Sequence, residues 1–344
     1  MRKKSIYANL LNPANVKSYQ AVTGMTHKLQ IVYGDIFQSW LLGDGSGDHP
    51  TNPIRAKLAR DFIVDAMGDD CVQLSPTGDL SKEEIVAAVK TVHSETFVDR
   101  VIQGNCGEWS GVRPEMADVA LAMFAGTMRG VKAILNEEAR LVFNPMGAKH
   151  HAQRDRSSGF CVFNDMAWAA LEFQKAGLKP LYLDWDIHAG DGVYRMLKGS
   201  GIPTISIHNG GYFPWDSEMQ TGSSQRATKH NANLHSYNFN VVNGDGDEAF
   251  KWAMDGAAEI IRGYKPDVIL LAAGADGHLG ANNLGVDSNY TKSGYEYAAR
   301  VVADLANVFS NGRVLIGGAG GYQPLKETPE IWALVAEAIY SGTK

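Results

Sequence analysis

The sequence predicts an α/β fold in which helices cover both faces of a mainly parallel β-sheet. Short runs of apolar residues alternate along the chain with longer segments of helical periodicity. Strands that are apolar throughout are typical of a parallel sheet that is buried on both faces. Most of these runs lead directly into polar or glycine-rich residues, and ligands of open α/β sheets bind outside the carboxyl ends of the strands. The sequence therefore predicts one shared site at that edge of the sheet.

Six apolar runs are the predicted strands. They are LQIVYG at 29–34, RLVFN at 140–144, PLYLDWD at 180–186, PTISIH at 203–208, PDVILLAAGAD at 266–276 and RVLIGG at 313–318. Polar or glycine-rich clusters end or follow five of these runs: His150 with His151, residues 184–191, residues 206–208, Asp276, and residues 317–322.

The helices are predicted from apolar residues at intervals of three and four. One helix begins after Ser81, because Ser81 and Glu84 have the spacing of a capping box and apolar residues follow at helical intervals. The other predicted helices cover residues 114–135, 164–177, 247–264, 292–309 and 329–340.

Length and composition indicate one large domain. Residues 1–28 lack clear periodicity and are interpreted as an N-terminal extension to a domain at 29–344. The net charge of −6 argues against a protein that binds the phosphate backbone of nucleic acids. The three cysteines form neither a disulfide framework nor a CxxC motif, which favours a reducing compartment. With no apolar segment of signal-peptide or membrane-spanning length, we expect a cytoplasmic protein without membrane contact.

A metal site is predicted in LYLDWDIHAGDG. Asp184, Asp186 and His188 alternate there with apolar residues, so on an extended strand their side chains lie on one side. Such ligands suit Zn²⁺, Fe²⁺ or Mn²⁺, and a catalytic site needs about three protein ligands and an open position. Asp276 ends an apolar run expected to lie near the first and is the best candidate for the third ligand. Taken alone, a polar turn that caps the next helix explains DxDxH equally well.

His150 and His151 are adjacent and follow the predicted strand at 140–144. A metal hydrolase needs a base near the attacking water and a carboxylate that orients this base. Asp184 and Asp191 are available for the orienting role. The alternative is a structural role for the two histidines.

Four segments together resemble the histone deacetylase family, which includes acetylpolyamine amidohydrolases and acetoin-utilisation proteins. They are GAKHHAQRDRSSGFCVFND, LYLDWDIHAGDGV, LLAAGAD and GGAGGY, and they appear in the family's order. Looser similarity covers residues 29–340. The resemblance implies a three-layer αβα fold of the arginase/deacetylase type with a central sheet of about eight strands. It also implies a metal-dependent deacetylase that acts on acetyl-lysine, an acetylpolyamine or a related small molecule.

The resemblance implies roles for the metal ligands and for a tyrosine. Asp186, His188 and Asp276 match the metal ligands, with Zn²⁺ as the expected metal and Fe²⁺ as the alternative. Tyr322 matches the tyrosine that donates a hydrogen bond to the substrate carbonyl, whereas without the other motifs it would be an ordinary aromatic beside a glycine turn.

The paired catalytic histidines of the family match His150 and His151. By the same resemblance, Asp184 holds His150 and Asp191 holds His151, and His151 serves first as general base and then as general acid.

The acyl channel is also implied by the resemblance. Gly159, Phe160 and Phe213 match its walls, and the alternative for the two phenylalanines is packing in the core. Leu284 is expected at the rim, together with Tyr212 and Trp215.

A structural cation, usually K⁺ in the family, would be held by main-chain oxygens of Asp184, Asp186 and His188 together with Ser206 and Ile207. All-oxygen ligation suits such a hard cation. A hydrogen-bond network at the strand ends is the alternative.

Arg55 in HPTNPIR matches an arginine that lines an inner channel for released acetate, and a surface charge is the alternative. Two segments depart from the family pattern: Ala189 replaces a frequent second histidine, and GHLGANNLGV at 277–286 differs beside Asp276. These differences, together with the predicted loop at 219–234, are expected to affect specificity and leave the chemistry unchanged.

Two other functions are weighed against a deacetylase. An arginase-type ureohydrolase needs two Mn²⁺ ions and a further aspartate two positions after Asp276, where this chain has His278. A non-catalytic binder of acetyl groups would be expected to lack a ligand, a histidine or the tyrosine, and this chain has them all.

Overall fold

The computed structural model describes residues 28–281 and 284–343, so the predicted N-terminal extension lies outside the described residues except for Lys28. A nine-stranded sheet crosses the described part of the chain. Its strands are β1 (Leu29–Val32), β2 (Cys71–Leu74), β3 (Leu141–Asn144), β4 (Pro180–Asp184), β5 (Thr204–Asn209), β6 (Ala227–Asn231), β7 (Ser236–Val241), β9 (Val268–Ala272) and β11 (Val314–Gly317). Two short strands, β8 (Asp245–Gly246) and β10 (Ser288–Asn289), form a separate pair.

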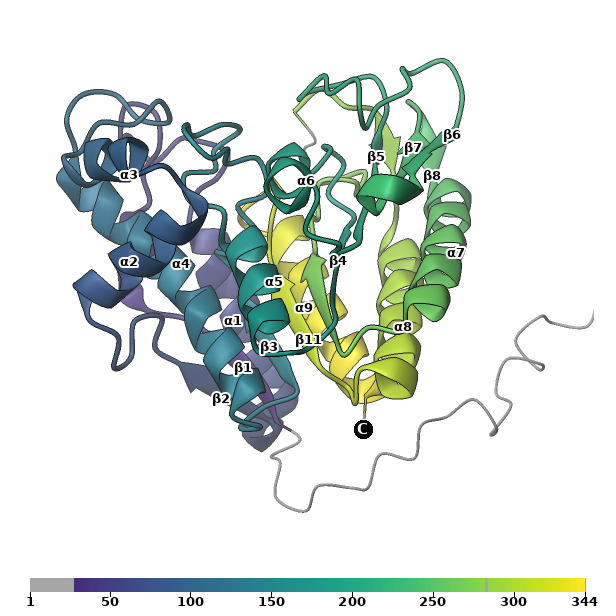
Figure 1. Ribbon diagram of the computed structural model, residues 1–344, viewed down its shortest axis with the longest axis horizontal. Helices are drawn as coiled ribbons and strands as arrows, with labels where there is room; N and C mark the ends of the chain where they lie inside the picture. The colour runs from purple at the N-terminus through teal and green to yellow at the C-terminus, as the bar shows by residue number, and fades with distance from the viewer. Residues whose placement is uncertain (1–27, 282–283, 344) are drawn as a thin grey trace, which may run out of the picture.

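The order of strands in the large sheet is β2-β1-β3-β11-β9-β4-β5-β7-β6. All neighbours are parallel except β6, which pairs antiparallel with β7 at one edge. Helices cover both faces of this sheet (Figure 1). The predicted three-layer αβα fold with a mainly parallel sheet is therefore confirmed, and the six predicted strands are all present.

The helices are α1 (Ile54–Met67), α2 (Lys82–Val92), α3 (Glu95–Ile102), α4 (Pro114–Leu135), α5 (Asp165–Lys175), α6 (Asp191–Leu197), α7 (Asp247–Tyr264), α8 (Lys292–Phe309) and α9 (Glu327–Gly342). The predicted capping box begins α2: Ser81 and Glu84 each accept a hydrogen bond from the other's backbone N–H. None of the described helices is long and apolar enough to cross a membrane.

The core lies in two layers, one on each face of the sheet. In β3, Leu141 and Phe143 belong to one buried cluster and Val142 to the other, because successive side chains of a strand point to opposite faces. Helices α2 to α6 pack on the Val142 side. The opposite face is covered by α7, α8, α9 and most of α1.

Five neighbouring strands carry the predicted site clusters. In spatial order they are β3, β11, β9, β4 and β5. Because these strands are parallel, the segments that follow them all leave at the same edge of the sheet. The predicted convergence of the clusters therefore follows from the strand order.

Candidate metal centre and active site

Asp186, His188 and Asp276 are brought together just beyond the sheet. Asp186 and His188 follow β4, and Asp276 follows the neighbouring strand β9. The three residues are buried, and one potential ligand atom from each lies within 4.8 Å of the other two. His188 Nδ1 lies 3.1 Å from Asp186 Oδ1 and 3.0 Å from Asp276 Oδ2.

The strand ends earlier than the alternation suggested. β4 stops at Asp184, whose Oδ1 accepts the N–H of Asp186 at 3.0 Å, and Asp186 Oδ1 in turn accepts the N–H of His188 at 2.9 Å. The intervening Trp185 and Ile187 are still buried in the core on the other side. The polar side chains therefore lie on one side, as predicted. Beyond Asp184, however, hydrogen bonds to side chains hold the backbone in place of β-sheet pairing.

The residues present fit a divalent cation. Burial and the charge of Asp186 raise the pKa of Asp276 to about 6. Burial alone would lower the pKa of His188, but its hydrogen bonds to Asp186 and Asp276 outweigh that effect and raise it to about 10. Both shifts show that the two buried carboxylates favour a positive charge beside them, which a bound metal ion would supply.

Gly320 keeps the carboxylates accessible. Its N–H donates to Asp186 Oδ2 at 2.7 Å. A Cβ atom on Gly320 would lie 2.4 Å from Asp276 Oδ2 and 2.5 Å from Asp186 Oδ2, so a side chain would fill the space beside the ligands. The glycine-rich approach to Tyr322 therefore has a local reason at this position.

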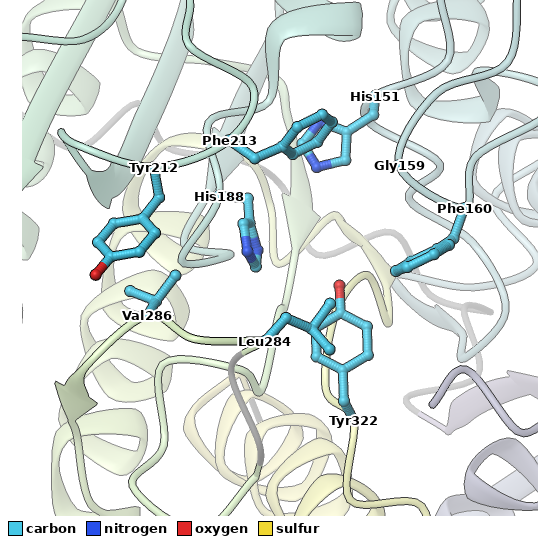
Figure 2. Close-up of a pocket in the computed structure, with 9 residues that line it drawn as sticks. All are labelled: His151, Gly159, Phe160, His188, Tyr212, Phe213, Leu284, Val286 and Tyr322. Atoms are coloured by element: carbon cyan, nitrogen blue, oxygen red, sulfur yellow. The ribbon is translucent and has the colours of Figure 1, made fainter. Parts of the chain in front are cut away.

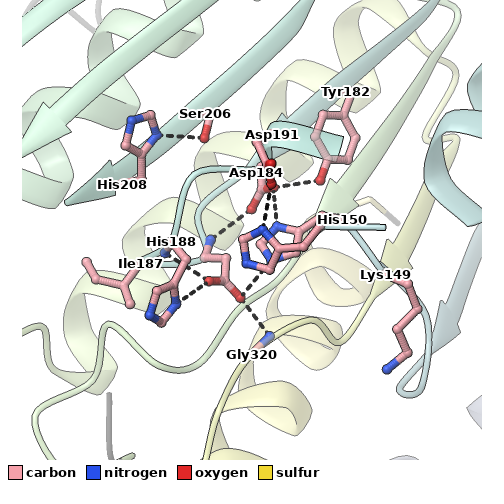
Figure 3. A network of polar contacts seen from close by, with 12 residues as sticks. Lys149, His150, Tyr182, Asp184, Ile187, His188, Asp191, Ser206, His208 and Gly320 are labelled. Atoms are coloured by element: carbon pink, nitrogen blue, oxygen red, sulfur yellow. Dashed lines mark hydrogen bonds and ion pairs between the residues drawn. The ribbon is translucent and has the colours of Figure 1, made fainter. Parts of the chain in front are cut away.

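The two histidines form separate pairs with carboxylates. His150 Nδ1 lies 2.8 Å from Asp184 Oδ2 (Figure 3), and His151 Nδ1 lies 2.8 Å from Asp191 Oδ1. The ring centroids are 4.0 Å apart. Because a carboxylate accepts at each Nδ1, the Nε2 atom of each ring is left to face the site.

The environment makes the two histidines unequal. Burial alone would lower the pKa of His150, but the charges of Asp184 and Asp186 raise it to about 9. Burial and the neighbouring charge of His150 lower the pKa of His151 to about 4, against the opposing effect of Asp191. At neutral pH, His151 is therefore the neutral ring that can accept a proton.

Two supporting residues were missed by the sequence reasoning. Gln153 Nε2 donates to Asp191 Oδ2 at 2.7 Å and to the carbonyl oxygen of His151 at 3.1 Å. The Tyr182 hydroxyl donates to Asp184 Oδ2 at 2.6 Å. Both lie two positions from a predicted site residue, which is the only signal that could have identified them.

A cavity of about 210 Å³ opens onto this cluster (Figure 2). Figure 2 shows Phe160 and Phe213 on opposite sides of it. A Cβ atom on Gly159, which has φ +54, would lie 2.5 Å from His151 Cδ2. The lining residues are His151, Gly159, Phe160, His188, Tyr212, Phe213, Leu284, Val286 and Tyr322. All four predicted channel residues are included, whereas Val286 was missed and Trp215 lies outside the lining, stacked on Tyr212.

Tyr322 points its hydroxyl into the cavity (Figure 2). Burial and the charges of Asp276 and Asp186 raise the pKa of Tyr322 well above its usual value, so the hydroxyl remains a hydrogen-bond donor. The guanidinium of Arg55 donates to the carbonyl oxygen of Gly321, which holds the backbone next to the tyrosine. Arg55 is only 2% exposed, so its alternative interpretation as a surface charge is wrong.

The chain matches the family model described as the histone deacetylase domain over residues 49–339. The chain belongs to the histone deacetylase family. It is 27% identical over 327 residues to the acetoin utilization protein AcuC of Bacillus subtilis, covering 88% of this chain and 80% of the relative. It is 29% identical over 295 residues to histone deacetylase B of Dictyostelium discoideum, covering 80% of this chain and 65% of that protein.

The remaining positions show where this member of the histone deacetylase family differs. Ala189 is buried in a small cluster with Tyr194 and Met219. His278 accepts the N–H of Gly280 at its Nδ1 atom, 3.1 Å away, and is not part of the metal cluster. The predicted loop at 219–234 contains the edge strand β6, so that part of the prediction is wrong.

The predicted structural-cation residues lie in, or just after, the neighbouring strands β4 and β5. Asp184 in β4 is the register partner of Ser206 in β5. Ser206 Oγ also lies 2.8 Å from His208 Nδ1. Ile207 is fully buried on the opposite side, so only its main chain is available to a cation.

Proposed function

We propose that the chain is a metal-dependent deacetylase that hydrolyses the amide of an N-acetylated amine. The observation that carries this proposal is that a three-ligand metal cluster, a neutral His151 held by Asp191, and the Tyr322 hydroxyl all meet at one cavity. Each is required by amide hydrolysis with activated water: a metal, a base, and a donor for the developing oxyanion. Membership of a family of deacetylases supports the same reaction.

Asp186, His188 and Asp276 would hold the metal, which we propose to be Zn²⁺, with Fe²⁺ as the alternative. When bound, such an ion lowers the pKa of water and polarises the amide carbonyl. Among the described residues, these three form the one group that could hold a metal, which supports a site for a single ion over the two-ion site of a ureohydrolase.

The protein's residues divide the remaining work. His151 Nε2 would accept a proton from the attacking water and later donate it to the leaving amine, while Asp191 fixes the ring. Tyr322 would donate a hydrogen bond to the amide oxygen as negative charge develops on it. Nearby carboxylates raise the pKa of His150 to about 9, and its Nε2 lies 3.8 Å from Asp186 Oδ2. His150 would therefore help to stabilise the negative charge that develops on the amide oxygen.

We further propose that Phe160 and Phe213 hold the aliphatic chain of the acetylated amine, such as acetyl-lysine or an acetylpolyamine. The cavity they wall is largely apolar, and Leu284 lies at its rim with 41% of its surface exposed. A flat chain between two rings would bury apolar surface without requiring a charged partner.

We also propose a structural K⁺ beside Asp184 of β4 and Ser206 of β5, and a cytoplasmic location. The buried oxygens of Asp184 and Ser206 support the first. The three cysteines support the second, since all are free thiols, with Cys161 buried and the other two partly buried.

Removal of the metal tests the proposal directly. Dialysis of the full chain against a chelator should abolish hydrolysis of an acetyl-lysine peptide and of acetylputrescine, and added Zn²⁺ or Fe²⁺ should restore it. The measurement is amine release together with metal content. Full activity in protein shown to be metal-free would contradict the proposed chemistry.

Gly159→Ala tests the acyl channel. A methyl group there meets the His151 ring, so we expect kcat/KM to fall by at least about tenfold, which corresponds to 1.4 kcal/mol. Gly68→Ala is the matched control, because Gly68 has a similar φ of +52 but nothing within 4 Å of the added Cβ. Both variants should lose more than about 1 kcal/mol of stability, measured by denaturant unfolding, because an added Cβ is strained at a positive φ. Gly159→Ala should lose more than Gly68→Ala, because its methyl group also meets the His151 ring. Equal kcat/KM values in the two variants would show that Gly159 does not line the acyl channel.

A further inference from the structure

A surface groove of about 500 Å³ lies next to the loop at 153–156. Helix α5 contacts both α2 and α6 on one face of the sheet (Figure 1), and these three helices line the groove together with the loop. Among the described residues, the groove shares no lining residue with the cavity of Figure 2. Small-molecule sites usually have volumes of about 300–1,000 Å³, so the groove is large enough for a small ligand.

The walls of the groove combine positive charge with apolar surface. Arg154 and Arg156 come from the loop, and Arg195 comes from α6. Each of the three helices also contributes one apolar side chain; these are Val92, Leu171 and Met196. A ligand that fits both kinds of wall needs an anionic group and an apolar group.

The protein's own carboxylates use these arginines only in part. In the described part of the chain, Arg154 has no ion-pair partner. Arg156 lies 3.4 Å from Asp155 Oδ1, but the two side chains are 62% and 70% exposed, so their attraction is weak. Arg195 donates to the buried carboxylate of Asp216 through Nε and Nη2, so its Nη1 remains available. The two aspartates offset two of the three positive charges, and the groove keeps an excess of positive charge.

Gln153 connects the groove to the proposed general base. It lines the groove, and its Nε2 donates to Asp191 Oδ2 at 2.7 Å and to the carbonyl oxygen of His151 at 3.1 Å. The carbonyl oxygen of Gln153 lies 2.8 Å from Nδ1 of His93, whose Nε2 accepts the N–H of Asn164 at 2.8 Å. Burial lowers the pKa of His93 to about 4, so this ring is neutral and its Nδ1–H donates to Gln153. Gln153 is therefore held on the core side and borders the groove on the other.

We propose that the groove binds a small phosphate ester that carries an apolar group, and that a ligand in the groove acts on His151 through Gln153. Guanidinium groups bind phosphate oxygens with paired, charge-assisted hydrogen bonds, and a phosphate group offers enough oxygens for more than one arginine. The apolar part of the ester would be buried against Leu171 and Met196. Only the action on His151 rests on the proposed function.

Binding of phenyl phosphate tests the site. Isothermal titration calorimetry is performed on the full chain, loaded with Zn²⁺ and saturated with a hydroxamate, so that phosphate is kept from the metal. Arg154→Met should raise the Kd of phenyl phosphate by about tenfold, because a charge-assisted contact is lost. The variant should fold, since the side chain is exposed and the backbone carbonyl still accepts the N–H of Ser94 at 2.7 Å.

Arg300→Met is the matched control. Arg300 is an exposed arginine of α8 that pairs with Glu296, and its replacement should leave the Kd unchanged. Inorganic phosphate should bind the unmodified chain at least about tenfold more weakly than phenyl phosphate, because it has no apolar part. Equal Kd values for phenyl phosphate in the unmodified chain and in Arg154→Met would overturn the site. Equal Kd values for the two phosphates would overturn the assignment to an ester.

Turnover tests the connection to His151. Without the hydroxamate, phenyl phosphate should raise kcat for an acetyl-lysine peptide by about twofold, because a ligand in the groove restrains the loop that holds Asp191. The rise should be absent in Arg154→Met. Gln153→Met should bind phenyl phosphate with an unchanged Kd and should also lack the rise. A kcat that does not rise, or that changes equally in the unmodified chain and in Arg154→Met, would overturn the connection.

The calorimetric result separates this inference from the proposed function. Arginine-dependent binding of phenyl phosphate to a chain that hydrolyses no acetylated amine would contradict the deacetylase and support the groove site. Normal hydrolysis with no effect of Arg154→Met on the Kd would support the deacetylase and overturn the groove site.

Discussion

Asp186→Ala should reduce hydrolysis of an acetyl-lysine peptide by at least about a thousandfold and remove the bound metal. Asp186 lies 3.1 Å from His188 Nδ1, and its Oδ2 accepts the N–H of Gly320, so it joins the metal cluster to the loop that carries Tyr322. With two ligands left, the site has too few donors for a catalytic ion. The measurements are kcat/KM and metal content by mass spectrometry.

A matched control for this variant is Asp118→Ala. Asp118 is an exposed residue of α4 that pairs with Lys82 at the surface. Its replacement by alanine should leave both activity and metal content unchanged. Thermal unfolding gives a second measurement: added Zn²⁺ should stabilise the unmodified chain and fail to stabilise Asp186→Ala. Retention of full activity by Asp186→Ala would show that the cluster is not the reaction centre.

Tyr322→Phe should reduce kcat by about 100- to 1,000-fold while metal content stays the same. The hydroxyl faces the cavity, and burial next to two carboxylates keeps it protonated, so it serves as a donor throughout the working pH range. The donor is needed most when negative charge develops on the amide oxygen, so the loss should be in kcat and KM should change little.

Tyr297→Phe is the control for this substitution. The hydroxyl of Tyr297 donates to Asp255 at the surface, and its loss should not affect kcat. Tyr322→Phe should also bind a hydroxamate inhibitor, which shows that the cavity is intact. An unchanged kcat in Tyr322→Phe would show that other groups, and not Tyr322, stabilise the negative charge on the amide oxygen.

The elements with strong periodicity were predictable, and those with weak or mixed patterns were not. All six apolar strands and the six predicted helices appear near their predicted bounds. Strand β7 was missed because Asn238 and Asn240 interrupt its apolar pattern. Both asparagines are buried, and this is possible because their side-chain amides donate to the carbonyl oxygens of Lys229 and Met219. Helix α1 was missed because its buried face consists of Arg55, two alanines and one isoleucine.

The donor types of the site were predictable from local spacing, together with the resemblance. Alternation beyond β4 places Asp184, Asp186 and His188 on one side, whatever the rest of the chain does. The strand order then decides which distant residue joins them. Because β9 lies beside β4, Asp276 reaches His188 across 88 positions of sequence.

The sequence by itself therefore determined the fold class, the edge of the sheet that carries the site, and the chemical types of its groups. These depend on apolar periodicity and residue identity, which are local properties. Tertiary structure alone decided that Gln153 supports Asp191, that burial and the charge of His150 lower the pKa of His151, and that Lys149 and Arg55 line the same inner cavity. Such contacts depend on burial and on charges from several elements, and these exist only after the strands and loops have packed together.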